Sequence, residues 1–228
     1  MKNCLKLLLV IILLHQPTQA DAKFKFKKLF RSLFMMPHIG YEQGRWESSY
    51  DDSVVDSKTY GDTIGIRYGF FAGMKLKKYF YIAGSMDWGN STWRYNEGED
   101  FAYDDDFVNT SASRSSWGAV VGVRLTKKSI FWFGYDFKNE LELSENHDPE
   151  LVAPTYSGTA MKFGLTTNRK KIMYSLFYYI DSFDEVKFEG EEEAVELPRR
   201  YDRFDIGEFK HTSFVLSVSY FWGRFKGK

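Results

Sequence analysis

The chain has 228 residues, and its 31 basic and 31 acidic side chains leave no formal net charge. A balanced charge argues against a general nucleic-acid binder, because such binders need a basic surface to meet the phosphates. The mean hydropathy of −0.41 is that of a soluble protein. After residue 14 no apolar run approaches the ~20 residues that a membrane-spanning helix needs. Aromatic residues nevertheless make up 18% of the chain, an enrichment typical of β-barrels that cross a membrane.

Residues 1–20 predict a cleaved secretory signal peptide. Two lysines precede an apolar run from Leu7 to Leu14, and small residues follow, so cleavage after Ala20 or after Ala22 fits equally well. The single cysteine, Cys4, lies before the apolar run and inside this segment. The mature chain is therefore expected to hold neither a disulfide nor a reactive thiolate.

Residues 23–36 form a basic segment in which Phe and Leu recur at helical spacing opposite lysines and an arginine. This pattern predicts a short amphipathic helix that lies on a membrane surface and ends before Pro37. The alternative is a disordered basic leader into the first strand.

From Thr63 to Met86 the pattern changes to a period of two, which indicates strands with one apolar face. Ile64, Ile66 and Tyr68 alternate with small or polar residues, a short basic turn follows, and the alternation resumes at Phe80. This predicts a β-hairpin, and the same unit recurs to the C-terminus. The other strands are predicted near residues 38–46, 116–125, 131–138, 159–166, 172–180 and 214–222.

The connections between these eight strands alternate between two kinds. Three are short and basic, at about residues 75–78, 127–128 and 169–171. Four are long and acidic, at about residues 47–56, 89–115, 139–158 and 183–211. Outer-membrane barrels have short periplasmic turns and long external loops. The pattern therefore predicts an all-β, eight-stranded antiparallel up-and-down transmembrane β-barrel over residues 37–225, with both termini on the periplasmic side.

The last strand, S-F-V-L-S-V-S-Y-F-W at Ser213–Trp222, places aromatic and aliphatic residues on alternate positions. With the loop pattern, it resembles the small eight-stranded outer-membrane barrels of the OmpA/OmpX and opacity-protein type over about Pro37–Phe225. The resemblance is one of pattern and not of motif, and the chain departs from it in the six residues that follow Trp222. It implies a monomer in the bacterial outer membrane, surrounded by lipid and lipopolysaccharide, with no cofactor.

The inward face of the predicted barrel carries charges of both signs, which should pair inside a low-dielectric wall. The residues are Glu42, Arg67, Asp87, Arg124, Asp136, Lys138 and Lys162. We expect a structural network that fills the lumen, since eight strands enclose little more than their own side chains. The alternative is a narrow gated pore that runs between inward glycines, namely Gly65, Gly69, Gly118, Gly122, Gly134 and Gly164.

The acidic loops suggest recognition of an extracellular ligand or a host surface, because long loops on a rigid barrel are where binding normally occurs. Divalent-cation binding at Tyr103–Asp106 is an alternative, although no EF-hand spacing is present. His38 and His147 have no second ligand at metal spacing, so no metal site is expected.

Catalysis is the rival class of function, because some small barrels modify lipid A. The only candidates are His211 and Ser213, two residues apart on one face of the last strand, as a base and a nucleophile would need. Because side chains alternate between the two faces of a strand, the pattern that places Phe214 and Leu216 outward places this pair inward, away from a lipid substrate. We therefore expect a non-enzymatic barrel with a structural or surface-interaction role, and a lipid A acyltransferase or deacylase as the alternative.

Overall fold

The structure is a computed structural model, and it describes residues 32–52, 55–76, 79–96, 110–144, 154–188, 193–197, 199–200, 205–206 and 208–223. The predicted signal peptide, most of the basic segment, the Tyr103–Asp106 stretch and His147 lie outside these residues, so the statements about them stay predictions. In the described part of the chain, no helix is long and apolar enough to cross a membrane.

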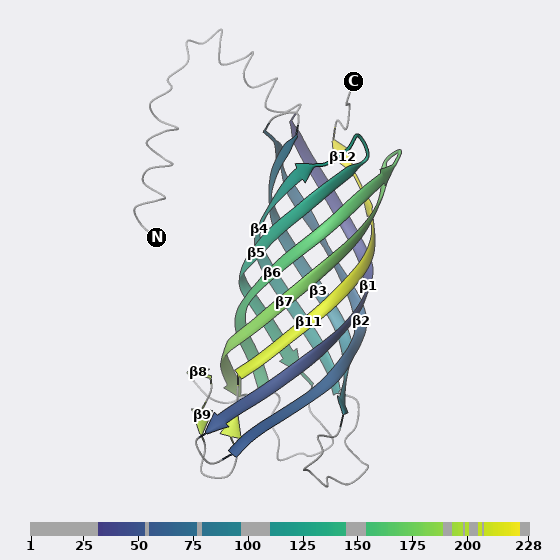
Figure 1. The fold of residues 1–228 in the computed structure, drawn as a ribbon. Coiled ribbons are helices and arrows are strands. Elements are labelled where there is room, and N and C mark those ends of the chain that lie inside the picture. The colour runs from purple at the N-terminus through teal and green to yellow at the C-terminus, as the bar shows by residue number, and fades with distance from the viewer. Residues whose placement is uncertain are drawn as a thin grey trace, which may run out of the picture.

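Eight long antiparallel strands form a closed up-and-down barrel, as the sequence predicted (Figure 1). Each strand pairs with its neighbours in chain order, and β11 pairs with both β7 and β1 to close the sheet. The strands are β1 (Leu33–Asp52), β2 (Val55–Lys75), β3 (Phe80–Asn96), β4 (Thr110–Arg124), β5 (Ser129–Leu143), β6 (Pro154–Arg169), β7 (Ile172–Phe188) and β11 (Glu208–Tyr220).

Four short strands complete the described structure. β8 (Val195–Glu196) pairs antiparallel with the end of β7, while β9 (Arg199–Arg200) and β10 (Asp205–Ile206) pair with each other. β12 (Trp222–Gly223) pairs with the start of β1, so the first and last described residues lie together at the end of the barrel that holds the short turns (Figure 1). We call this the short-turn end and the opposite one the long-loop end.

The strands are tilted around the barrel axis. Following paired residues from Met36 on β1 once around the barrel leads back to β1 at Trp46, ten residues further along. Such a stagger is what an eight-stranded barrel needs in order to close with strands tilted by roughly 35–45°. Closure leaves none of the eight long strands as a free edge, and their backbone groups are satisfied by their neighbours.

The strands are longer than the alternation of apolar residues predicted. Residues 33–36, the end of the predicted amphipathic helix, are strand, because they pair with both β2 and β12. The first predicted loop, residues 47–56, is instead a hairpin in which Asp52 pairs with Val55. Residues 89–96, 110–115, 139–143, 154–158, 183–188 and 208–211 were likewise predicted as loop and are strand. The outward residues of the stretches from residue 89 onward are polar, and an alternation of apolar residues cannot reveal such stretches.

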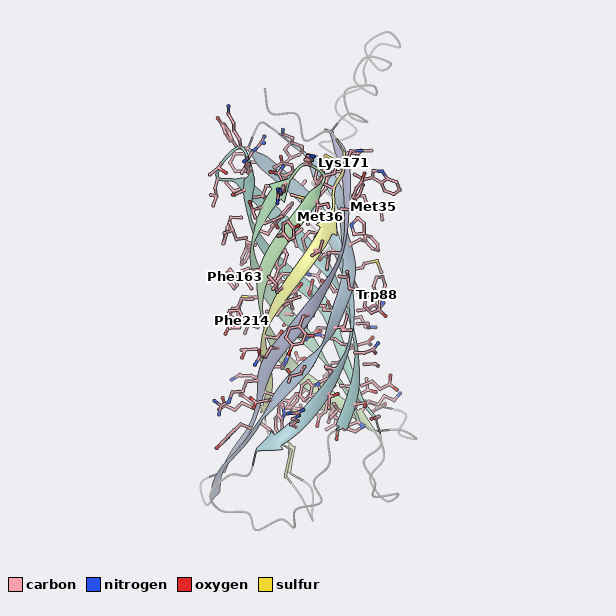
Figure 2. All side chains as sticks on the ribbon, turned by 90° about the vertical axis from the view of Figure 1, so that its right-hand side faces the viewer. Met35, Met36, Trp88, Phe163, Lys171 and Phe214 are labelled. Carbon is pink, nitrogen blue, oxygen red and sulfur yellow. The ribbon has the colours of Figure 1, made fainter. Side chains whose placement is uncertain are left out.

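An apolar belt surrounds the short-turn half of the barrel. It consists of outward side chains that leave a large part of their surface exposed, as Figure 2 shows for Met35 and Phe214. Its members include Ile39, Tyr41, Ile66, Tyr68, Met86, Trp117, Phe133, Tyr135, Leu165, Tyr174, Leu176, Phe214, Leu216 and Val218. Towards the long-loop end the outward residues become polar, and on β5 the change comes at Lys138. In this half of the barrel the outer surface is therefore predominantly apolar.

The interior is filled in three layers. At the short-turn end a cluster of large side chains includes Phe34, Phe71, Tyr81, Trp132 and Phe177. At the long-loop end a second cluster consists of Trp46, Trp93, Ala112, Leu141, Leu143, Phe183 and Phe209. Polar and charged residues lie between the two clusters. On β7, for example, Asp181 separates Tyr179 of the first cluster from Phe183 of the second.

Candidate functional site

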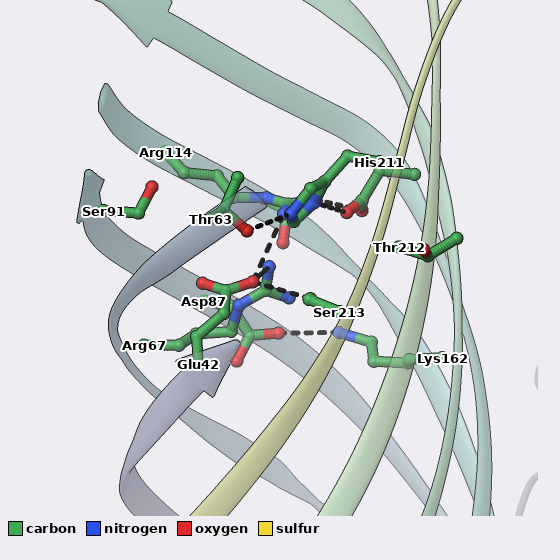
Figure 3. A network of polar contacts seen from close by, with 12 residues as sticks. Glu42, Thr63, Arg67, Asp87, Ser91, Arg114, Lys162, His211, Thr212 and Ser213 are labelled. Carbon is green, nitrogen blue, oxygen red and sulfur yellow. Dashed lines mark hydrogen bonds and ion pairs between the residues drawn. The ribbon is translucent and has the colours of Figure 1, made fainter. Parts of the chain in front are cut away.

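Each of the eight long strands contributes at least one charged or titratable side chain to the middle layer of the interior. Figure 3 shows several of these side chains, among them Arg67, Lys162 and His211. In strand order these residues are Glu42, Arg67, Asp87, Arg114, Asp136, Lys162, Asp181 and His211, and His38 of β1 joins them. All are buried, and we call them the lumen network. It divides into a lysine cluster and an arginine cluster, defined below.

The lysine cluster comprises Lys162, Asp87, Asp136 and His38. The Lys162 ammonium donates to Asp87 Oδ2 at 2.7 Å and forms an ion pair with Asp136 Oδ1 at 2.8 Å. His38 Nε2 lies 2.8 Å from the other oxygen of Asp87. His38, expected to be isolated, is therefore a partner in this cluster. Two aspartates share one lysine, so the loss of the lysine would leave both carboxylates without their main counterion.

The arginine cluster comprises Arg67, Arg114, Glu42, Asp181 and His211. Arg67 donates to Glu42 at 2.6 Å, and its guanidinium lies over the ring of Tyr179, 3.8 Å from the centroid. Arg114 pairs with Asp181, which also contacts His211 Nδ1 at 2.8 Å. The positive charges of the two arginines in this cluster equal the negative charges of its two carboxylates. Buried charges that are paired and hydrogen-bonded in this way can be accommodated in a protein interior.

The structure places the residues that were predicted to face the lumen at three different locations. Glu42, Arg67, Asp87, Asp136 and Lys162 lie in the network, with side chains that are at most 4% exposed. Arg124 is buried at the short-turn end, where it donates to the carbonyl oxygens of Thr126 and Lys127 and braces the β4–β5 turn. Lys138 was predicted to face inward and lies outside.

A β-bulge in β5 explains the position of Lys138. Trp117 of β4 pairs with Lys138, whereas the next residue, Gly118, pairs with Asp136, so Phe137 is an extra residue in β5. The bulge turns both Phe137 and Lys138 outward and shifts the alternation by one. Asn139 therefore points inward, where it accepts from Arg114 Nε at 3.0 Å and donates to Asp181 at 3.2 Å. Lys138 pairs with Glu140 on the outer surface at 2.6 Å.

The two weak catalytic candidates do not contact each other. Ser213 donates to Glu42 at 2.7 Å, whereas His211 Nε2 lies 2.9 Å from the hydroxyl of Thr63. The line Asp181–His211–Thr63 has the contacts of an acid–base–hydroxyl relay, but the three residues are at most 2% exposed. Because no substrate can reach a hydroxyl that is buried in this way, the relay has the geometry of a packed interior network.

The inward glycines do not line open gaps. A Cβ at Gly164 would lie 2.1 Å from the ring of Phe177, and one at Gly122 would lie 2.6 Å from the ring of Trp132. Large side chains from the neighbouring strand therefore occupy the space beside Gly122 and Gly164, and at Gly65, Gly69 and Gly118 a Cβ would lie within 2.4 Å of a backbone oxygen of the neighbouring strand. The narrow pore suggested by the sequence has no free path at these positions.

The pattern of the sequence did not identify four members of the network. Arg114 lay in a predicted loop, and Asp181 lay one residue beyond the predicted end of its strand. His38 was regarded as isolated, and His211 was considered only as a catalytic base. Extending the alternation on β7 from Phe177 and Tyr179 by one step would have found Asp181, because it continues the inward face.

Other features of the described residues do not form a reactive site. No group of three or more His, Cys, Asp or Glu side chains in this part of the chain is arranged to hold a metal ion. Beyond the belt, on the outer surface of β11, a hydrogen bond to Glu208 raises the pKa of Lys210. That exposed pair contributes little to stability, since exposed ion pairs are worth ~0–1 kcal/mol.

A closed eight-stranded barrel with buried charges in its interior and an apolar belt on its outer surface is the fold of the small eight-stranded outer-membrane barrels. No protein-family model matches the sequence, and no curated protein matches it either. The chain is similar in structure to Ail, the attachment invasion locus protein of Yersinia pestis, with 13% identity and a TM-score of 0.47 over 84% of this chain and 99% of that chain.

Two further solved structures are similar. The outer membrane protein OprG from Pseudomonas aeruginosa is 6% identical, with a TM-score of 0.45 over 86% of this chain and 99% of that chain. Neisserial surface protein A is 10% identical, with a TM-score of 0.43 over 81% of this chain and 96% of that chain. At these identities and TM-scores the similarities do not define a shared function.

Proposed function

We propose that the protein is a monomeric outer-membrane β-barrel that serves as a closed, non-catalytic scaffold and interacts with partners through its long-loop end. One observation carries this proposal: the barrel exposes a belt of apolar side chains on its outer surface and buries charged side chains in its interior. Ile66 on the outer face of β2 is 53% exposed, whereas Arg67, the next residue, is 1% exposed. In water such an exterior would be costly, and a membrane removes that cost because lipid solvates the apolar belt.

The orientation follows from the two ends of the barrel. The three connections at the short-turn end are short, and the β6–β7 turn consists only of Lys170 and Lys171. At the other end the strands continue past the belt as polar walls. Outer-membrane barrels place short turns in the periplasm and long loops outside. We therefore assign the long-loop end to the cell exterior, which agrees with secretion through the predicted signal peptide.

The filled interior supports a scaffold role. The lumen network lies between the two apolar clusters, and His211, Ser213 and Thr63 within it are at most 2% exposed. A partner would therefore bind to the polar outer wall or to the connections at the long-loop end. Recognition on such segments of a rigid scaffold is common, and the surrounding lipid, including lipopolysaccharide, is the first partner to consider.

The membrane assignment is tested by electrophoresis of the outer-membrane fraction in SDS, with and without boiling. A closed barrel resists SDS when cold because its backbone has no free edge, so we expect a shift in mobility on boiling. Recovery in the soluble periplasm without a shift would refute the assignment and favour a lipocalin-like carrier.

The scaffold role is tested separately. In planar bilayers the purified protein should produce no single-channel conductance, and deletion of the gene should leave the lipid A mass profile unchanged. Reproducible conductance would establish the pore alternative, and a changed acylation pattern would establish the lipid-modifying enzyme.

A further inference from the structure

A trough runs along the outer wall of β3 and β4, beyond the apolar belt. The outward residues there are short, namely Asn90, Thr92, Ser111, Ser113 and Ser115. Longer side chains flank them: Ile64 and Ile66 on β2, and Glu140 and Glu142 on β5. Short residues between long ones leave two adjoining hollows of about 550 Å³ and 310 Å³, which share Asn90, Ser113 and Glu142.

The end of the trough nearer the short-turn end meets the belt. Tyr68 and Trp88 line it there, with their rings stacked at 6.2 Å between centroids and 23° between planes. Aromatic residues at such a boundary mark the interface between hydrocarbon and headgroups in membrane barrels. A molecule in the trough would therefore have its polar part beside the hydroxyl-lined wall and any apolar part along the belt.

The lining of the trough selects against phosphate and favours hydroxyl groups. Glu140 is paired with Lys138 at 2.6 Å, but no cation among the described residues pairs with Glu142. Glu142 receives only a long contact of 3.4 Å from Ser113. Arg114 also lines the trough, but its side chain is 6% exposed and is engaged by Asp181. A ligand here meets one free carboxylate, an amide and a row of hydroxyls, which together accept and donate hydrogen bonds.

We propose that this trough binds the sugar headgroup of an outer-leaflet glycolipid. Sugar hydroxyls would donate to Glu142 and exchange hydrogen bonds with Asn90 and Ser113, while the apolar wall of Ile64 and Ile66 leads the acyl chains onto the belt. The inference rests on the proposed membrane location and deepens it, because it assigns one side of the barrel to one class of lipid.

The test uses the purified mature protein in detergent and lipopolysaccharide without O-chain as the probe, with binding measured by native mass spectrometry or fluorescence titration. Ser113→Trp fills the trough from its floor and should weaken binding at least tenfold. The matched control is Ser182→Trp on β7, which is also exposed on the outer wall but does not line the trough; binding should stay within twofold. Glu142→Gln should weaken binding severalfold without filling space.

Three outcomes would overturn the inference. Equal binding by the Ser113→Trp and Ser182→Trp variants would show that the trough is not the site. Equal binding of the deacylated oligosaccharide and of the intact glycolipid would point to a free glycan instead. Ser113-dependent binding of phosphatidylglycerol would point to phosphate. The boiling shift is recorded for each variant, so that a variant that fails to fold is recognised, and failure of the membrane assignment itself is seen in that assay and not in the titration.

Discussion

Lys162→Met gives the sharpest test of the lumen network. The ammonium is 1% exposed and lies 2.7 Å from an oxygen of Asp87 and 2.8 Å from one of Asp136. Methionine keeps most of the volume of the side chain but removes the charge, so two buried carboxylates lose the cation that they share. Because the loss of one partner from a buried ion pair costs about 3–5 kcal/mol, we expect unfolding to become easier by about 4 kcal/mol.

The assay is urea unfolding of the barrel in lipid vesicles, followed by the fluorescence of its six tryptophans. Lys138→Met is the matched control, because that lysine is on the outer wall, with a side chain 52% exposed. It should change the free energy of unfolding by less than ~1 kcal/mol. If the two lysine variants unfold within ~1 kcal/mol of each other, the argument that the lysine cluster is a buried charge network is wrong.

A double variant separates charge from packing. Lys162→Met combined with Asp136→Asn removes one charge of each sign and leaves Asp87 with His38. The double variant should be less destabilised than the sum of the two single variants by about 2–3 kcal/mol, as for groups in one network. Additive effects would mean that the two side chains act independently.

Two further predictions concern the two faces of the wall. Ile66→Arg places a cation on the lipid-facing surface and should destabilise the inserted barrel by about 2–4 kcal/mol, whereas Ser182→Arg beyond the belt should be tolerated; equal membrane yields would contradict the position of the belt. Gly122→Val drives a side chain into Trp132 and should cost about 1–3 kcal/mol in urea unfolding. Gly84→Val on the outer face, where a Cβ meets nothing closer than 3.8 Å, is its control, and a similar loss in both would argue against tight packing inside.

Much of the fold could be predicted from alternation alone. On β2 the outward Ile66 and Tyr68 and the inward Arg67 were assigned to the correct faces, because in a strand neighbouring residues point to opposite sides. The ends of the strands could not be found in this way. Ser113 and Ser115, for example, are outward residues of β4 beyond the belt, where an outward residue is as polar as a loop residue.

The candidate site was predicted in part. Asp87 and Lys162 were expected inside and are there, but nothing in the order of residues showed that they meet, since they lie on β3 and β6. Lys138 was assigned to the wrong face because a strict period of two cannot anticipate a bulge. Whether an extra residue is accommodated depends on the register of both neighbouring strands, and this is fixed only when the barrel closes.

The sequence by itself determined that this chain forms strands, how many of them, which side chains face lipid, and which end carries the short turns. These features follow locally from the two-residue alternation of side chains along each strand and from the lengths of the connections. Only the tertiary structure decided which charges pair, how the interior is filled, and where the outer wall is hollowed. The physical reason is that closure of the barrel brings together residues as distant in sequence as Glu42 and Ser213. The ten-residue stagger of the closed barrel determines which residues of different strands lie at the same height along its axis.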